Sequence, residues 1–205
     1  MKKERIKNSF GNAAKTYDSV AKVQNLSSCE LISLIDAPKI SKILDIGCGT
    51  GNTSLELYKK FPKETKIICC DAEKYEFIEN YDLAVANLCV QWFEDLPKFV
   101  KKIKGRCNEF AFSTLLDKSF SFYKSFFDYP PTFDYPSSEK LLDEIGRVKK
   151  FKISRYSLEF ENSFAVARYF RKLGANLRST KASSVAKIQS KKPIILDYEI
   201  FFAVV

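Results

Sequence analysis

The segment SKILDIGCGTGNTSLELYKKF (residues 41–61) constrains the fold of this chain more than any other stretch. A short apolar run ends at Asp45, three glycines follow at alternating positions (Gly47, Gly49 and Gly51), and a sequence with helical periodicity comes next. A strand, a glycine turn and a helix in this order form the first half of a βαβ unit. We therefore expect a sheet of parallel strands to begin here.

Strand-like and helix-like segments keep alternating after this unit. We expect strands at 66–71, 81–90 and 108–115, and a helix at 96–104 that Gly105 ends. Such alternation predicts a parallel sheet covered by helices. The remaining expected elements are a helix over 9–37 that Pro38 stops, a helix over 137–146, a strand over 151–160, a helix over 163–176 and a final strand over 193–205.

Length and composition indicate one ordinary globular domain. The chain has 205 residues, of which 45% are hydrophobic and 29% charged, and no apolar run approaches the length of a membrane helix. The basic start lacks the apolar core of a secretory signal, so we expect a cytoplasmic protein. We expect a single domain over 1–205, with a helical cap at 1–38 and a lid at 119–136, where three prolines interrupt an aromatic stretch.

Residue usage also restricts the chemistry. Histidine is absent, which removes the commonest general base and the commonest metal ligand. The six cysteines form no C-x-x-C pair, so we expect small buried thiols in a reducing compartment and no metal site. The net charge of +9 suits an acidic partner, although a composition rich in lysine explains it equally well.

The glycine segment has the features of a site for a nucleoside with an ammonium group. Glycines let the backbone turn sharply and approach a ligand, while amides at a helix N-terminus face it. Asp45 stands two residues before the first glycine, in a G-x-G-x-G spacing that differs from the dinucleotide G-x-G-x-x-G. Asp71 follows Gly51 by 20 residues, where a carboxylate can hold ribose hydroxyls. Here the sequence resembles the class I methyltransferases that use S-adenosylmethionine.

A more specific resemblance extends over nearly the whole chain. The segments SFGNAAKTYDSVAKVQ, ILDIGCGTG, YDLAVANLCVQWFEDLP, FAFSTL, YFRKLGAN and LDYEIFFAVV resemble, in order, the malonyl-[acyl-carrier protein] O-methyltransferases of biotin synthesis. The resemblance implies a Rossmann-like three-layer α/β sandwich, mostly parallel with an antiparallel C-terminal strand. It also implies methyl transfer from S-adenosylmethionine to the free carboxylate of a malonyl thioester on an acidic acyl-carrier protein, without nucleic acid or membrane. We expect a monomer, and the sequence leaves open whether carrier protein or coenzyme A bears the malonyl group.

The resemblance places the functional residues at the ends of the strands and on two helices. A carboxylate is already a nucleophile, so its methylation requires alignment more than proton removal, and we assign no certain catalytic residue. An arginine on the helix over 163–176 could hold the substrate carboxylate; Arg168 matches the family by position, and Arg171 is its alternative. The expected cofactor-binding residues are Asp45, Gly47, Cys48, Gly49, Gly51, Asp71, Asn87, Leu88 and Gln24, and the substrate-binding candidates are Tyr17, Gln91, Trp92, Ser113 and Arg168.

One segment departs from the family pattern. Between the strands at 66–71 and 81–90 stand roughly nine residues, where the family has another helix and strand. Asp71 can therefore be the ribose carboxylate after the second strand, or the acidic residue that lies beside the adenine in the family. Either interpretation predicts a sheet one strand short of seven, with a more open adenine pocket.

This gap keeps two other functions open. One is a methyltransferase for another small carboxylic acid, and the other is a degenerate protein that binds the cofactor or a partner without catalysis. An amino-methylating enzyme of nucleic acids would carry an N/D-P-P-Y/F motif after the third strand, where this chain has Asn87-Leu88-Cys89-Val90.

Overall fold

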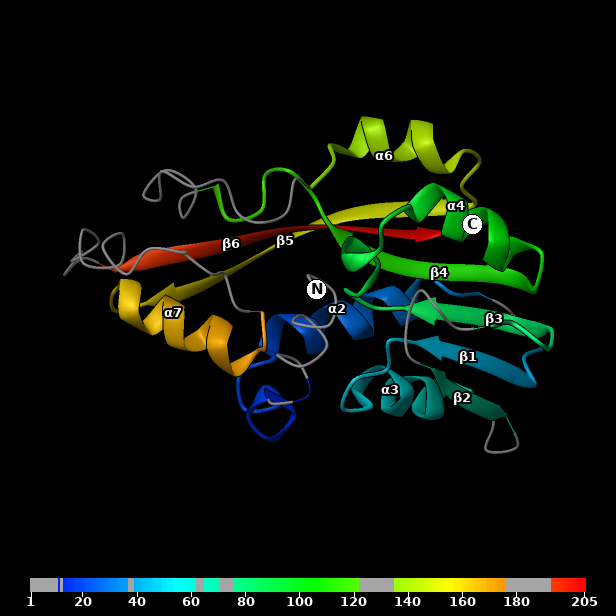
Figure 1. Ribbon diagram of the computed structural model, residues 1–205, viewed down its shortest axis with the longest axis horizontal. Helices are drawn as coiled ribbons and strands as arrows, with labels where there is room; N and C mark the ends of the chain where they lie inside the picture. Colours follow the sequence, from blue (N-terminus) through cyan, green and yellow to red (C-terminus); the bar gives the residue numbers. More distant parts are fainter. Residues whose placement is uncertain are drawn as a thin grey trace. The chain divides into compact units, whose positions relative to one another are not determined.

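A six-stranded sheet forms the centre of the computed structural model, which describes residues 11, 13–36, 39–61, 65–70, 76–121, 135–175 and 193–205 (Figure 1). The strand order over these residues is β2-β1-β3-β4-β6-β5. β1 pairs in parallel with β2 and β3, β3 pairs in parallel with β4, and β4 pairs antiparallel with β6. The strands are β1 (Lys42–Ile46), β2 (Lys66–Cys70), β3 (Tyr81–Ala86), β4 (Cys107–Leu115), β5 (Lys150–Phe160) and β6 (Ile194–Val204).

The described sheet has the six strands that the short segment predicted, one fewer than the family's seven. β2 is the outermost strand and lies directly beside β1, in register from Lys42 opposite Lys66 to Ile46 opposite Cys70. Residues 66–70 therefore occupy the second-strand position next to the glycine turn.

Two predicted bounds were too long. The helix over 163–176 ends at Lys172, because Gly174 has a left-handed φ of 72°, and the strand over 81–90 ends at Ala86, because the chain turns at Leu88 with a φ of 45°. The other helices lie close to their predicted positions, with one exception. Asp95, Ser137 and Asn162 cap α4, α6 and α7 by accepting from the main-chain amides of Lys98, Lys140 and Ala165, and so satisfy donors that a helix N-terminus leaves free. The helices are α2 (Lys22–Ser33), α3 (Asn52–Lys60), the 3-10 helix η1 (Val90–Trp92), α4 (Leu96–Lys104), α6 (Ser138–Ile145) and α7 (Ser163–Lys172).

The exception is the single helix predicted over 9–37, which was wrong in its continuity. Residues 13–17 are helical, residues 18–20 form a turn, and α2 starts at Lys22. The hydroxyl of Ser19 donates to the carbonyl of Thr16 at 2.6 Å. Serine side chains that bond nearby main chain compete with helical hydrogen bonding, and this competition accounts for the interruption.

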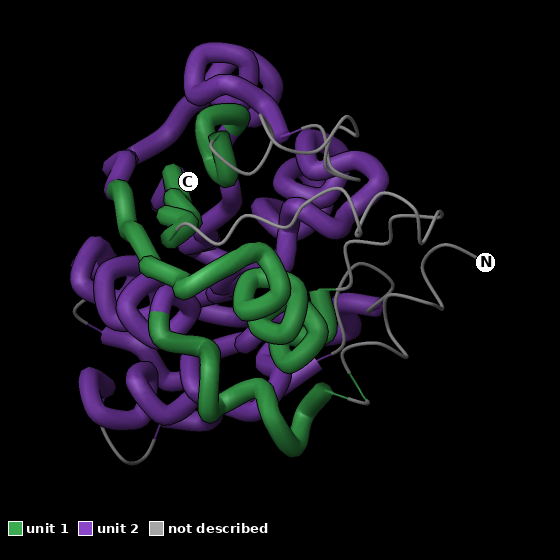
Figure 2. Tube along the Cα trace, turned by 90° about the vertical axis from the view of Figure 1, so that its left-hand side faces the viewer, with its two compact units in different colours: residues 1–22, 117–134, 155–199 green, residues 23–116, 135–154, 200–205 purple. Residues whose placement is uncertain are grey.

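The chain divides into two compact units (Figure 2). One consists of residues 1–22, 117–134 and 155–199, and the other of residues 23–116, 135–154 and 200–205. We call them unit 1 and unit 2 and describe each by itself. The predicted single domain stays a prediction, and most of the predicted lid at 119–136 lies outside the described residues.

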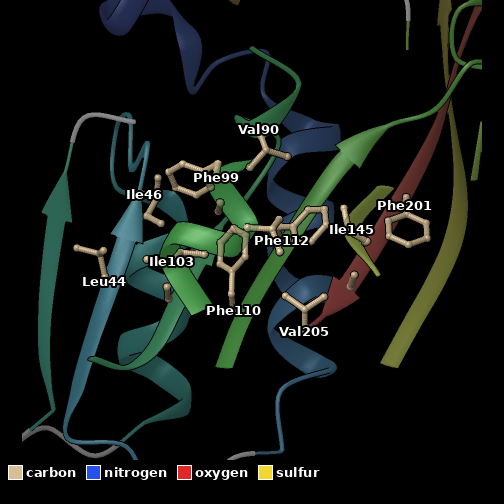
Figure 3. Close-up of a cluster of buried hydrophobic side chains, with 14 of the residues drawn as sticks. Leu44, Ile46, Val90, Phe99, Ile103, Phe110, Phe112, Ile145, Phe201 and Val205 are labelled. Carbon is tan, nitrogen blue, oxygen red and sulfur yellow. The ribbon is translucent and has the colours of Figure 1, made fainter. Parts of the chain in front are cut away.

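Unit 2 has three layers. α4 and α6 cover one face of the sheet, where Phe99 and Ile103 of α4 pack with Phe110 and Phe112 of β4 and with Ile145 of α6 (Figure 3). The ring centroids of Phe99 and Phe110 lie 5.9 Å apart, in an edge-to-face arrangement. This core fixes β1, β3 and β4 relative to one another. The sandwich that the sequence predicted is therefore present.

α2 and α3 lie together in the same unit. The ammonium of Lys60 on α3 donates to the carbonyls of Ile32 and Ile35 near the end of α2, at 2.7 and 2.6 Å. The hydroxyl of Ser28 on α2 donates to that of Thr53 on α3, at 3.1 Å. α2 is thereby tied to the helix that follows the glycine turn.

Unit 1 has an aromatic core of its own. Phe120 packs edge-to-face on Phe170 and Tyr198, with ring centroids 5.6 and 4.8 Å away. The hydroxyls of Tyr169 and Tyr198 lie 2.8 Å apart. Within the described part of the chain, we find no helix with both the length and the apolar character that crossing a membrane requires.

Candidate functional site

The glycine turn after β1 has the backbone that its sequence predicted. All three glycines have positive φ, which is 68° at Gly47 and 90° at Gly51, a region that other residues rarely adopt. The amide of Gly47 donates to the carbonyl of Cys70 at 2.9 Å, which attaches the turn to the end of β2. A Cβ on Gly47 would lie only 2.9 Å from the Cβ and Sγ of Cys89. Glycine is therefore required at position 47 by conformation and by space.

Asp45 is a buried carboxylate directly below this turn. Its side chain is 1% exposed, and the Ser54 hydroxyl and amide, from the first turn of α3, both donate to it. Burial raises the pKa of Asp45 to about 6, although the bonds from Ser54 act in the opposite direction. No described cation forms an ion pair with this carboxylate. A ligand with an ammonium group would supply the missing charge.

Four of the six cysteines surround the same turn, although their arrangement differs from the prediction of buried thiols. None of the six forms a disulfide, but Cys29 and Cys69 are exposed and only Cys70 is buried. The thiol of Cys89 donates to the carbonyl of Ile46 at 3.2 Å. Burial is the largest cause that raises the pKa of Cys48, to about 12, with the neighbouring Cys69 adding to it. Cys48 is therefore a neutral thiol at physiological pH.

Asn87 is the centre of a hydrogen-bond network at the end of β3. Its Oδ1 accepts from the hydroxyls of Ser27 and Ser113, both at 2.7 Å. Its Nδ2 donates to the main-chain carbonyl of Gln24 at 3.0 Å. The register of Ala86 opposite Phe112 brings Asn87 beside Ser113, as expected for neighbouring parallel strands. The network thus joins β3, β4 and α2.

Leu88 continues this network in an unusual conformation. Its φ of 45° lies in the left-handed region, which costs a residue other than glycine roughly 1–2 kcal/mol. Its amide donates to the Ser113 hydroxyl at 2.9 Å, and its carbonyl accepts from Nε2 of Gln91 at 2.7 Å. These two bonds hold a strained turn at the edge of the sheet where ligands bind in open α/β folds.

Two side-chain oxygens near this turn have no donor. Oε1 of Gln24 and Oε1 of Gln91 are buried and accept no hydrogen bond from the described part of the chain. A buried acceptor without a partner costs free energy, and structures usually supply one. Both oxygens are therefore candidates to accept from the N–H groups of a ligand.

The structure brings most of the predicted cofactor residues together and leaves one untested. Asp45 and the glycine turn follow β1, Asn87 and Leu88 follow the adjacent strand β3, and Gln24 is bonded to Asn87 through its carbonyl. Asp71 lies outside the described residues, so both interpretations of its role stay predictions. Ser27 and Ser54 were not predicted from the sequence. Ser27 is a serine on a helix, and only the structure shows that it is buried.

The predicted substrate residues divide between the two units. Gln91 and Trp92 lie on η1 in unit 2, where Trp92 is partly exposed, and Ser113 is fully buried. Tyr17 and Arg168 belong to unit 1. Tyr17 is partly exposed, and Arg168 is exposed on α7 without an ion pair to any described carboxylate.

Unit 1 also contains a pocket of about 330 Å³ that none of the predicted site residues lines. Nε and Nη2 of Arg155 donate to Oε1 of Glu199 at 3.0 and 2.7 Å, so this cation is already paired. The lining residues are Lys118, Ser121, Arg155, Asp197, Tyr198 and Glu199.

Curated relatives confirm the resemblance that the sequence suggested. A malonyl-[acyl-carrier protein] O-methyltransferase from Priestia megaterium is 33% identical over 127 residues, which are 49% of this chain and 46% of that protein. Malonyl-[acyl-carrier protein] O-methyltransferase 1 from Ilyobacter polytropus is 28% identical over 210 residues, covering 85% of this chain and 78% of the relative. The chain spans about half the length of the first relatives that it matches. No protein-family model matches it.

Solved structures agree with the fold. A SAM-dependent methyltransferase from Thermotoga maritima superposes with a TM-score of 0.55 at 13% sequence identity, covering 97% of this chain and 98% of that one. Identity this low bears on the fold alone. The chain therefore has the Rossmann-like fold of the class I methyltransferases, with the predicted antiparallel strand near its C-terminus.

Proposed function

We propose that this chain transfers a methyl group from S-adenosylmethionine to the free carboxylate of a malonyl thioester on an acyl-carrier protein, an early step of biotin synthesis. The observation that carries the proposal is the buried Asp45 carboxylate beneath the glycine turn, in a chain similar to enzymes of that name. Six cysteines without a disulfide are consistent with action in the reducing cytoplasm.

The residues present fit S-adenosylmethionine. The glycine turn leaves room for close approach, Asp45 lacks a cation, and Gln24 and Gln91 lack donors. Gly47, Cys48, Gly49 and Gly51 would surround the amino-acid end of the cofactor. When bound, S-adenosylmethionine supplies an electrophilic methyl group on a sulfonium.

The protein's own contribution is to hold and align the reactants. Asp45 would bind an ammonium group, and the strained turn at Asn87 and Leu88 would fix the methyl donor at the strand ends. A carboxylate acceptor is ionised at neutral pH and needs no general base. The whole chain contains no histidine, which suits such a reaction.

The acidic partner and the carboxylate-binding residue extend the proposal to unit 1. Arg168 is an exposed guanidinium that could bind a carboxylate through two parallel hydrogen bonds. The net charge of +9 would favour association with an acidic carrier protein. Tyr17 and Trp92 remain candidates for contact with the acyl group.

The test combines binding and transfer. Calorimetry with S-adenosylmethionine measures cofactor binding, and transfer of labelled methyl from it to malonyl-carrier protein measures the reaction, with malonyl-coenzyme A and free malonate as alternative acceptors. Arg168→Ala should raise KM for the malonyl substrate while leaving cofactor affinity unchanged. Arg171→Ala tests the alternative arginine, and Lys172→Ala, which removes an exposed cation from the same helix, is the matched control.

The outcomes separate the alternatives. Absence of cofactor binding at submillimolar concentration would contradict the enzyme. Binding without transfer to malonyl would favour another small acid or, if no acid is methylated, a non-catalytic protein. Growth of a biotin-requiring strain that lacks this methyltransferase, restored by the chain, would support the full proposal.

A further inference from the structure

The turn at Asn87 and Leu88 is fixed by two serines that come from distant parts of the chain. Ser27 is on α2 and Ser113 is on β4, and both side chains are 0% exposed. Each donates to the same oxygen, Oδ1 of Asn87, at 2.7 Å. Two donors on one oxygen fix the orientation of the amide, because Nδ2 must then face the carbonyl of Gln24.

Ser113 has a second function in the same network. Its oxygen accepts from the amide of Leu88 at 2.9 Å while its hydrogen goes to Asn87. A leucine with φ of 45° needs such support, since the conformation is unfavourable in isolation. Because the hydroxyl is fully used and buried, Ser113 is not available to touch a substrate.

The turn is also bonded to two residues whose side-chain oxygens lack a donor. Asn87 binds the main chain of Gln24, and the carbonyl of Leu88 accepts from Nε2 of Gln91 at 2.7 Å. The two orphaned oxygens, Oε1 of Gln24 and Oε1 of Gln91, therefore both belong to residues that are bonded to this turn. If either serine lost its hydroxyl, the positions of both glutamines would become less defined.

We infer that Ser27 and Ser113 are positioning residues that hold Asn87 and Leu88, and through them Gln24 and Gln91, in the conformation that binds the cofactor. The inference rests on the proposed function for the identity of the ligand. It changes the expected role of Ser113 from substrate contact to support of the turn. It also assigns a role to Ser27. The side chain of Ser27 makes α2 part of the site, because it donates to Asn87.

The experiment uses the full chain with Ser27→Ala, Ser113→Ala and Ser113→Thr. Calorimetry with S-adenosylhomocysteine should show binding at least about tenfold weaker for both alanine variants. Ser113→Ala leaves the Leu88 amide without its acceptor, and Ser27→Ala removes one of the two donors that orient the Asn87 amide. Ser113→Thr keeps the hydroxyl and should recover most of the affinity. The matched control is Ser41→Ala, whose hydroxyl donates to Asp82 at 2.7 Å, at the opposite end of the same strand β3; its affinity should equal that of the wild type.

A second measurement detects the turn itself without any ligand. Hydrogen exchange of the Leu88 amide, followed by NMR, should be faster in Ser113→Ala than in the wild type, while the amides of β4 keep their protection. Unchanged exchange at Leu88, or unchanged affinity in Ser27→Ala, would overturn the inference. If the wild type fails to bind S-adenosylhomocysteine, the proposed function and the ligand role of the serines fall together, whereas Leu88 exchange still decides whether they hold the turn.

Discussion

Asp45 has an unfavourable environment until a cation binds. Its pKa is about 6 in the folded chain against 3.8 for a free side chain, because burial disfavours the charged form. The native state therefore holds more protons than the unfolded state between these values. Stability falls as pH rises through this window, and above pH 6 the full cost of about 3 kcal/mol is present.

Asp45→Asn should separate stability from binding. Without ligand at pH 7.5, we expect the variant to have a free energy of unfolding about 1–3 kcal/mol above that of the wild type, and the difference should shrink as pH is lowered to 4. Its affinity for S-adenosylmethionine should fall because the carboxylate no longer offers a charge. Urea unfolding at several pH values and calorimetry measure the two effects. If the variant and the wild type differed in free energy of unfolding by the same amount at all pH values, or if the variant were less stable at pH 7.5, this account of Asp45 would be contradicted.

Gly47 and Gly51 allow the cost of a left-handed backbone to be separated from the cost of a steric clash. Alanine at either position meets a left-handed backbone, which costs roughly 1–2 kcal/mol. Only at Gly47 would the added Cβ also meet Cys89, at 2.9 Å, whereas nothing lies within 4 Å at Gly51. Gly47→Ala should therefore destabilise the chain more than Gly51→Ala in urea unfolding. If the two variants lost the same free energy of unfolding, Cys89 would have moved aside without cost, and the predicted clash would be contradicted.

At the scale of elements, α4 depends on one aromatic anchor. Phe99 is 4% exposed and lies beside Phe110 in the core (Figure 3). The centroid of its ring is 4.6 Å from that of Phe93 and 5.9 Å from that of Phe110. The charged residues of α4 face solvent, so this contact is central to its attachment to the sheet.

Phe99→Ala should lower the free energy of unfolding by about 3–5 kcal/mol, because it removes a large buried side chain and leaves a cavity. The control is Phe164→Ala on α7, where the ring is 49% exposed and the change should stay within about 0.5 kcal/mol. Urea denaturation followed by circular dichroism compares them. Similar values for the two variants would contradict the importance of this core.

At the scale of the whole molecule, the described sheet ends at β2. Among the described residues no strand lies beyond it, and the glycine turn, Asp45 and the Asn87 network are complete. We expect this reduction to affect the adenine side of the cofactor site and to spare the methyl-transfer side.

We therefore expect the site to discriminate only weakly between cofactor analogues that differ at the adenine base. We expect S-adenosylhomocysteine carrying a bulky substituent on the adenine amino group to bind within about tenfold of the parent compound, a difference of 1.4 kcal/mol or less. Competition calorimetry measures the ratio. Complete loss of binding by the substituted compound would show that other residues close the pocket.

The sequence by itself determined the order of strands and helices, the six-stranded sheet and the position of the glycine turn. These features depend on local signals, namely the periodicity of apolar residues and glycines where the backbone requires positive φ. Even here, the helix over 9–37 was interrupted by a local bond from Ser19 that its periodicity did not reveal.

The tertiary structure decided the contacts between residues far apart in the chain. Ser27, Asn87 and Ser113 meet only because β3 and β4 are neighbours in register and α2 lies across their ends. The same packing buries Asp45 and so raises its pKa, and it presses Cys89 against Gly47. Hydrogen bonds and burial of this kind depend on which segments pack together, and no local pattern encodes them.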